Sequence, residues 1–113
     1  MLKKSQRMGK KDIEKFFEGR FRNYKFGSVL LRVARNESKM PMFAFIISSS
    51  LKRNAVARNL TRRRMSEIAV ELAPKINNGL NLVFSFKLSQ KKAPSFQGLK
   101  DDMINLLSLC GAL

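Results

Sequence analysis

The sequence contains no histidine and only one cysteine, Cys110, among its 113 residues. Without histidine the chain offers neither a histidine general base nor a histidine metal ligand. A single thiol builds neither a cysteine zinc site nor an internal disulfide. Cys110 stands in an apolar C-terminal stretch, and we expect it to be a buried, unreactive thiol. These absences exclude histidine-dependent nucleophilic enzymes and cysteine-based zinc sites.

Acidic residues are also scarce, numbering eight against 23 Lys and Arg, for a formal net charge of +15. They are scattered, and the adjacent pair Asp101 and Asp102 would point about 100° apart on a helix. Such a pair suits the dipole at a helix start better than a two-metal site, which needs converging carboxylates. Neither of the common glycine-rich nucleotide-binding motifs occurs. We therefore predict no catalytic residue and no metal site within the chain, and so no self-sufficient nuclease.

Long apolar runs are missing as well. The longest, residues 42–47, is far shorter than the roughly 20 residues that a membrane-spanning helix needs. The N-terminal residues continue into polar sequence instead of an apolar secretory segment. With one thiol, the sequence fits a reducing compartment, and we expect a cytoplasmic protein. Binding to a membrane surface is a weaker alternative, because the apolar side of the basic helix should pack on a sheet.

What the sequence does contain is positive charge, concentrated in its first half. Residues 1–64 carry 18 basic and four acidic residues, whereas residues 65–113 carry five basic and four acidic ones. A compact chain with such a charge repels itself, and a polyanion relieves that repulsion. The hydrophobic fraction of 44% is too high for a disordered basic tail. We therefore expect a folded domain that presents one basic region to a nucleic acid.

The hydrophobic periodicity predicts a single domain, residues 1–113, that begins with a flexible basic arm at residues 1–9. Gly19 should end the first helix and Pro74 the second, and turn signals stand at residues 36–39 and 77–79. We expect helices at residues 10–18, 53–73 and 95–109, and strands at residues 20–26, 28–35, 42–48 and 81–88. This order is typical of an α+β fold, an α/β two-layer sandwich.

The predicted helix at residues 53–73 has an apolar stripe and a basic face. At about 100° per residue, Asn59, Arg62 and Arg63 lie opposite the stripe and Arg58 lies on its flank. The planar guanidinium of arginine donates in pairs to phosphate oxygens and stacks on bases. Solvated helix faces ordinarily carry both signs of charge, so we favour phosphate binding for this one. The apolar stripe comprises Ala57, Leu60, Thr61, Met65, Ile68, Ala69 and Leu72.

Two stretches of the sequence resemble the protein subunit of bacterial ribonuclease P. Residues 52–67, KRNAVARNLTRRRMSE, resemble that family's signature, in which Asn-Ala-Val precedes an arginine-rich helix. Residues 10–19, KKDIEKFFEG, resemble its N-terminal motif of an aspartate, spaced phenylalanines and a glycine. The chain departs from the signature at Leu60 and Ser66, where the family carries arginine. We expect Arg64, one turn after Leu60, to compensate for the first departure.

The resemblance implies a ribonucleoprotein enzyme in which a large RNA, with bound Mg²⁺, removes the 5′ leader of precursor transfer RNA. It implies a ribosomal protein S5 domain 2-like fold, with a mixed four-stranded sheet and a left-handed crossover between parallel strands. The partners would be ribonuclease P RNA and precursor transfer RNA, with no protein partner required. The residues that would bind the catalytic RNA are Lys52, Arg53, Asn54, Arg58, Asn59, Arg62, Arg63 and Arg64.

By the same resemblance, Ile13 and Phe17 would touch the leader in a cleft beside the sheet. Phe17 would stack on a base, which tolerates many leader sequences. We expect Phe16 to be a core residue. Phe17 could either be a core residue or contact the leader. The alternative for the whole chain is a ribosomal or other structural RNA-binding protein with no reaction, which composition does not exclude. We expect core positions for Phe43, Phe45, Phe84 and Phe86.

Overall fold

The computed structural model describes residues 2–37, 40–77 and 79–113, and its elements follow the predicted order. The predicted turns at residues 36–39 and 77–79 include residues 38, 39 and 78, which lie outside the described residues. The elements are η1 (Lys4–Gln6), α1 (Lys10–Glu18), β1 (Arg22–Phe26), β2 (Val29–Arg35), β3 (Met42–Ser49), α2 (Ala55–Leu72), η2 (Ala73–Lys75), β4 (Leu80–Leu88) and α3 (Phe96–Leu109).

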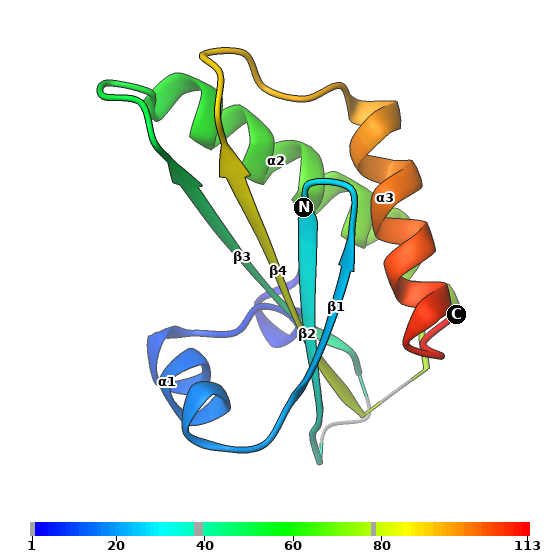
Figure 1. The fold of residues 1–113 in the computed structure, drawn as a ribbon. Coiled ribbons are helices and arrows are strands. Elements are labelled where there is room, and N and C mark those ends of the chain that lie inside the picture. Colours follow the sequence, from blue (N-terminus) through cyan, green and yellow to red (C-terminus); the bar gives the residue numbers. More distant parts are fainter. Residues whose placement is uncertain (1, 38–39, 78) are drawn as a thin grey trace.

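The four strands form one mixed sheet in the order β1-β2-β4-β3 (Figure 1). The pairs β1–β2 and β2–β4 are antiparallel, whereas β3 and β4 run parallel and are joined by α2. Phe45 of β3 stands opposite Phe84 of β4 in this parallel pair. The predicted α+β class and the crossover between parallel neighbours are therefore confirmed. In this order β1 and β3 form the two edges of the sheet.

Each face of the sheet has its own core. The larger core lies where α2 and α3 pack on the sheet, and it includes the buried side chains of Phe43, Phe84 and Met65. A smaller cluster on the other face joins Phe16 of α1 to Val83 of β4. Figure 1 shows α1 at the end of the sheet away from the loop between β3 and α2. Much of the second face is therefore left without a covering helix.

The N-terminal segment differs from the flexible arm that the sequence predicted. Leu2 is buried in the larger core and Met8 in the smaller one. The Met8 amide donates to the Phe43 carbonyl at 2.9 Å, and Arg7 forms a parallel bridge with Phe43. Edge strand β3 has unpaired backbone groups, and a passing segment can satisfy them. Backbone pairing and two apolar anchors thus fix residues 2–9 along this edge.

Candidate nucleic-acid interface

The buried side of α2 agrees with the predicted stripe. Leu60 is only half-buried and lies at the edge of the stripe. Thr61 is buried, but its hydroxyl donates to the Ala57 carbonyl at 2.7 Å, so no polar atom is left unsatisfied there. The residues that α2 buries are Ala57, Thr61, Met65, Ile68, Ala69 and Leu72. Burial of this side fixes the rotation of the helix and therefore which arginines face outward.

The outer side of α2 presents arginines that have no acidic partner. Arg62 and Arg63 are exposed, and Arg58 is half-buried. The Arg62 guanidinium donates to the Asn59 side-chain oxygen at 3.3 Å. Within the described ranges the ion pair found is Lys100–Glu71, so none of these three guanidiniums is neutralised by a carboxylate. Unpaired guanidiniums clustered on one helix suit the phosphates of a polyanion.

A groove of about 480 Å³ runs beside edge strand β3 and collects side chains from four parts of the chain. It brings together Ile13 of α1 and Asn59, Arg62 and Arg63 of α2, which the sequence predicted separately. Ser66, which replaces an arginine of the family signature, also lines this groove. The groove adds Arg7 and Phe45, which were missed because the N-terminal segment was predicted to be free and Phe45 to be core.

The loop before α2 is positioned by a buried amide. The Asn54 side chain is only 4% exposed, and its amide nitrogen donates to the Ser49 hydroxyl at 2.8 Å and the Gln90 carbonyl at 3.1 Å. The side chain of Asn54 is therefore removed from the predicted RNA-contacting set. Arg53 has a left-handed backbone with φ of 55°, so α2 begins at Ala55 and not at residue 53.

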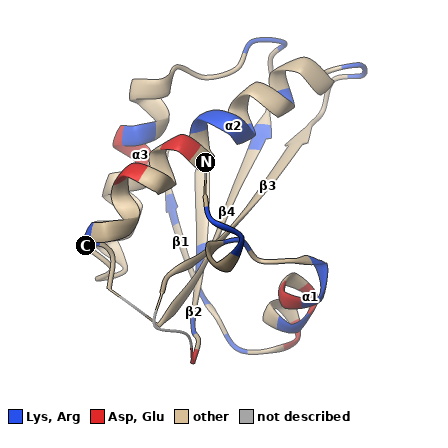
Figure 2. Ribbon diagram, turned by 180° about the vertical axis from the view of Figure 1, so that it is seen from behind, with Lys and Arg blue, Asp and Glu red and all other residues tan. Residues whose placement is uncertain are grey.

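The exposed cations of this loop have neighbours that the sequence analysis missed. Lys52 and Arg53 are exposed, and the Asn54 amide ties their loop to the loop between β4 and α3. That second loop carries exposed Lys91 and Lys92. Figure 2 shows basic residues on both loops at the same end of the molecule. The adjacent lysines before Pro94 were the available sequence signal for this extension of the basic surface.

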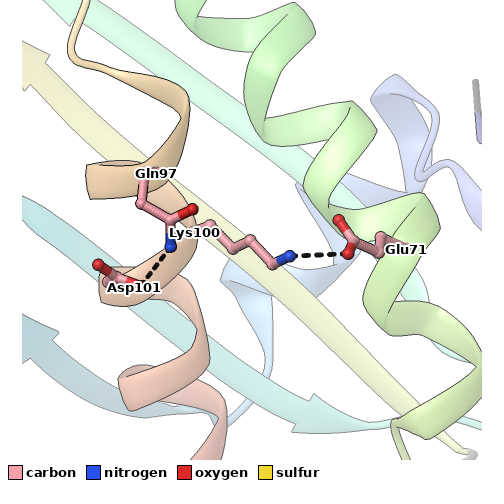
Figure 3. A network of polar contacts seen from close by, with 4 residues as sticks. All are labelled: Glu71, Gln97, Lys100 and Asp101. Carbon is pink, nitrogen blue, oxygen red and sulfur yellow. Dashed lines mark hydrogen bonds and ion pairs between the residues drawn. The ribbon is translucent and has the colours of Figure 1, made fainter.

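The side of α2 that faces α3 has a structural role. The Arg64 guanidinium donates to the Pro94 carbonyl at 2.6 Å, and Glu71 pairs with Lys100 of α3 at 2.7 Å (Figure 3). Gln97 donates to Asp101 at 2.8 Å on the same stretch of α3. Arg64 does not line the groove and is bonded to the segment before α3. The structure thus gives it a different position from the one expected of a substitute for an arginine at Leu60.

A cluster of aromatic rings lies one turn further along α1 from Ile13. Phe16 is buried, as predicted, whereas Phe17 is 41% exposed and meets Phe16 edge-to-face at 5.3 Å. The Arg32 guanidinium carbon lies 5.5 Å from the centre of the Phe17 ring, and the same group donates to the Ser85 hydroxyl at 3.0 Å. Phe17 does not share the groove with Ile13. Instead, the Phe17 ring forms a cation–π contact with Arg32. Arg32 was not predicted to be a site residue.

Two further expectations concern reactive groups and membranes. Cys110 is half-buried, and burial raises the pKa of its thiol above the ordinary value, which favours the unreactive protonated form. Among the described residues no three His, Cys, Asp or Glu side chains gather in a way that could hold a metal ion. No helix in the described ranges is long and apolar enough to cross a membrane.

Comparisons with known proteins bear on the whole chain. The RNase P protein of Staphylococcus aureus has 17% identity and a TM-score of 0.72, covering 96% of this chain and 98% of that one. The RNase P protein of Thermotoga maritima has 16% identity and a TM-score of 0.71, with coverages of 87% and 90%. At such identities the likeness shows the fold. Comparison with curated protein sequences gives no significant match. The family model described as Ribonuclease P matches residues 2–110, and the chain therefore belongs to the ribonuclease P protein family.

Proposed function

We propose that this chain binds ribonuclease P RNA through the outer side of α2 and thereby supports removal of the 5′ leader from precursor transfer RNA. The observation that carries the proposal is the set of unpaired guanidiniums on α2. Arg62 and Arg63 line the β3 groove, Arg58 lies on the flank of the same helix, and no carboxylate neutralises any of them among the described residues. Lys52 and Arg53 extend this basic surface at the helix start.

The division of labour follows from the side chains that are present. The chain offers cationic donors for phosphate but no histidine and, in the described ranges, no cluster of metal ligands. We assign hydrolysis to the RNA partner, whose bound Mg²⁺ would supply the chemistry. We propose that the complex acts in the cytoplasm. The arginines of α2 would lower the repulsion between RNA segments that must approach each other. The protein thus contributes binding and orientation, and its effect should be greatest when Mg²⁺ is scarce.

The leader is proposed to cross the side of the sheet that carries α1. Phe17 offers an exposed ring for a base, and stacking of this kind is worth roughly 1–3 kcal/mol per base. Arg32, held by Ser85 next to that ring, would place its charge near a leader phosphate. Ile13, one turn earlier on α1, would add an apolar contact in the β3 groove. Such contacts tolerate different leader sequences because every base has a flat face.

The test is cleavage of a labelled precursor transfer RNA by a bacterial ribonuclease P RNA at low Mg²⁺. Wild-type protein should restore cleavage, and an Arg62→Gln, Arg63→Gln variant should require far more protein for the same rate. The matched control is Lys11→Gln, Lys15→Gln, which removes the same charge from exposed positions of α1 outside the groove. This control should behave as wild type.

Three outcomes would contradict the proposal. Tight RNA binding without any support of cleavage, with cognate RNA also tested, would identify a structural RNA-binding protein. Cleavage by the purified protein alone with Mg²⁺ would identify a nuclease whose site lies elsewhere in the chain. Equal loss in the control and in the α2 variant would show that net charge, and not the α2 surface, is responsible.

A further inference from the structure

A larger hollow, of about 730 Å³, lies at the opposite edge of the sheet, next to β1 and the residues that follow α3. Three arginines line it, namely Arg20, Arg22 and Arg35, together with half-buried Tyr24. Phe21 also borders it, but the Phe21 ring packs on Phe16 at 5.1 Å. No carboxylate is among its lining residues. It shares no lining residue with the β3 groove, so the two are separate features of the surface.

The strand register explains why the arginines gather here. Arg22 of β1 stands opposite Val33 of β2, and residues opposite each other share a face of the sheet. Arg35 lies two residues beyond Val33 and therefore points to that same face, as a diagonal neighbour of Arg22 at roughly 7–8 Å between backbones. Tyr24 also stands on this face, opposite Leu31. The face is covered by α3 further along, and it is open where that helix has ended.

Like charges at this spacing need an explanation. Like charges directly opposite each other on a sheet are destabilising, and diagonal like charges repel each other more weakly. Within the described ranges Arg20, Arg22 and Arg35 have no ion-pair partner, since the pair found there is Lys100–Glu71. All three are exposed, so their charged groups reach solvent. An anionic ligand in the hollow would offset the repulsion among them.

The wall of the hollow is held in place by the rest of the fold. The Asn77 side-chain amide donates to the Gly111 carbonyl at 2.9 Å, and the Asn77 backbone amide donates to the Ala112 carbonyl at 3.0 Å. Ala112 is itself buried in the larger core. Gly111 has a φ of +79°, and open space lies where a side chain would begin. The hollow therefore exists before any ligand binds, which lowers the entropic cost of binding.

We propose that this hollow is a second RNA-binding site, in which the guanidiniums contact consecutive phosphates of a single-stranded segment and Tyr24 contacts a base. The proposal rests on the function proposed above, because it takes the chain's partner to be RNA. Paired donation by arginine fits phosphate oxygens, and aromatic rings beside a basic track are typical of single-strand binding. The protein would then hold RNA at both edges of its sheet.

The experiment measures RNA affinity against salt concentration for an Arg22→Gln, Arg35→Gln variant. One arm titrates ribonuclease P RNA, and the other titrates precursor transfer RNA onto the preassembled complex. Loss of two phosphate contacts should lower the slope of log affinity against log salt by about 1.4–1.8 and weaken binding about tenfold or more in one arm. The affected arm identifies the RNA that supplies the segment. The Lys11→Gln, Lys15→Gln control should keep the wild-type slope.

Two companion variants separate the possible failures. An Arg22→Lys, Arg35→Lys variant keeps both charges and should recover most of the slope. If the glutamine variant matches the control in both arms while Arg62→Gln, Arg63→Gln loses affinity, the second site is wrong and the proposed function stands. If wild-type protein binds neither RNA, both proposals fail. A further control titrates free uridine monophosphate. If the glutamine variant binds this nucleotide more weakly than wild type but keeps the wild-type RNA affinity, the hollow is a site for free nucleotides and the second RNA site is wrong.

Discussion

The two flanks of α2 carry the same kind of side chain in different surroundings. Towards the β3 groove, Arg62 and Arg63 form no ion pair among the described residues. They line the groove together with Ile13, Arg7 and Glu67. Towards α3, Arg64 donates to the Pro94 carbonyl and Glu71 pairs with Lys100. Residue type alone therefore does not mark an RNA-binding arginine. We expect the RNA-binding arginines to be those that are exposed beside the groove and not bonded to another element of the fold, as Arg64 is to Pro94.

The largest effect should come from reversing charge on the groove side. An Arg62→Glu, Arg63→Glu variant replaces two attractive phosphate contacts with two repulsive ones. Hydrogen bonds to charged groups contribute about 1.5–3 kcal/mol each, so RNA affinity should fall by about a hundredfold or more. Filter binding at fixed salt measures the affinity, and urea unfolding should show stability close to wild type. A hundredfold loss accompanied by unfolding would assign these arginines to the fold instead.

The next effect concerns the exposed Phe17 ring on α1. Phe17→Ala should weaken binding of the precursor transfer RNA leader about tenfold, because one stacked base contributes roughly 1–3 kcal/mol. Phe26→Ala is a matched control, since Phe26 is also 41% exposed but lies on β1. Comparing substrates with and without a leader isolates the effect. A loss that persists with the leaderless substrate would place Phe17 outside the leader site.

On the α3 flank the expected effect is on stability. Arg64→Ala removes a hydrogen bond from a charged donor to the Pro94 carbonyl, and it should lower the free energy of unfolding by about 1–2 kcal/mol. RNA affinity should change less than about twofold. Urea unfolding measures the stability and filter binding measures the RNA affinity. The control, Arg63→Ala, should lose RNA affinity but little stability. If Arg64→Ala lost RNA affinity and Arg63→Ala lost stability, the roles of the two flanks would be the opposite of those proposed.

The smallest effect should come from the ion pair between α2 and α3. Glu71→Gln keeps the shape and removes the charge that meets Lys100. Both side chains reach solvent, and exposed pairs contribute only about 0–1 kcal/mol. Unfolding measured at low and at high salt should show a small difference that disappears at high salt. A salt-independent loss above about 2 kcal/mol would indicate a packing role for Glu71.

The interface was predictable from sequence where its geometry is local. Burial of Ala57, Thr61, Met65 and Ile68 follows from helical spacing, and it fixes where Arg62 points. Strand patterns likewise predicted the four strands to within one or two residues at their ends. The parallel pairing of β3 with β4 followed from the family resemblance, because each strand pattern alone is silent on its partner.

The contacts that the sequence did not reveal have a common physical cause, which is that they join distant parts of the chain. Asn54 reaches Gln90, 36 residues away, and Arg64 reaches Pro94, 30 residues away. Neither partner is visible in a local pattern, and the family resemblance had placed both residues in the RNA-binding set. The N-terminal segment, predicted to be a flexible arm, pairs with β3 because β3 is an edge strand with free backbone groups.

The most direct test of the account compares two neighbouring arginines that α2 turns to opposite flanks. The measurement is the salt dependence of ribonuclease P RNA binding for Arg63→Gln and for Arg64→Gln, each beside wild type. The account predicts that Arg63→Gln lowers the slope by about 0.7–0.9, as expected for one lost phosphate contact, and that Arg64→Gln leaves it unchanged. Equal slopes for the two variants, or a loss confined to Arg64→Gln, would contradict it.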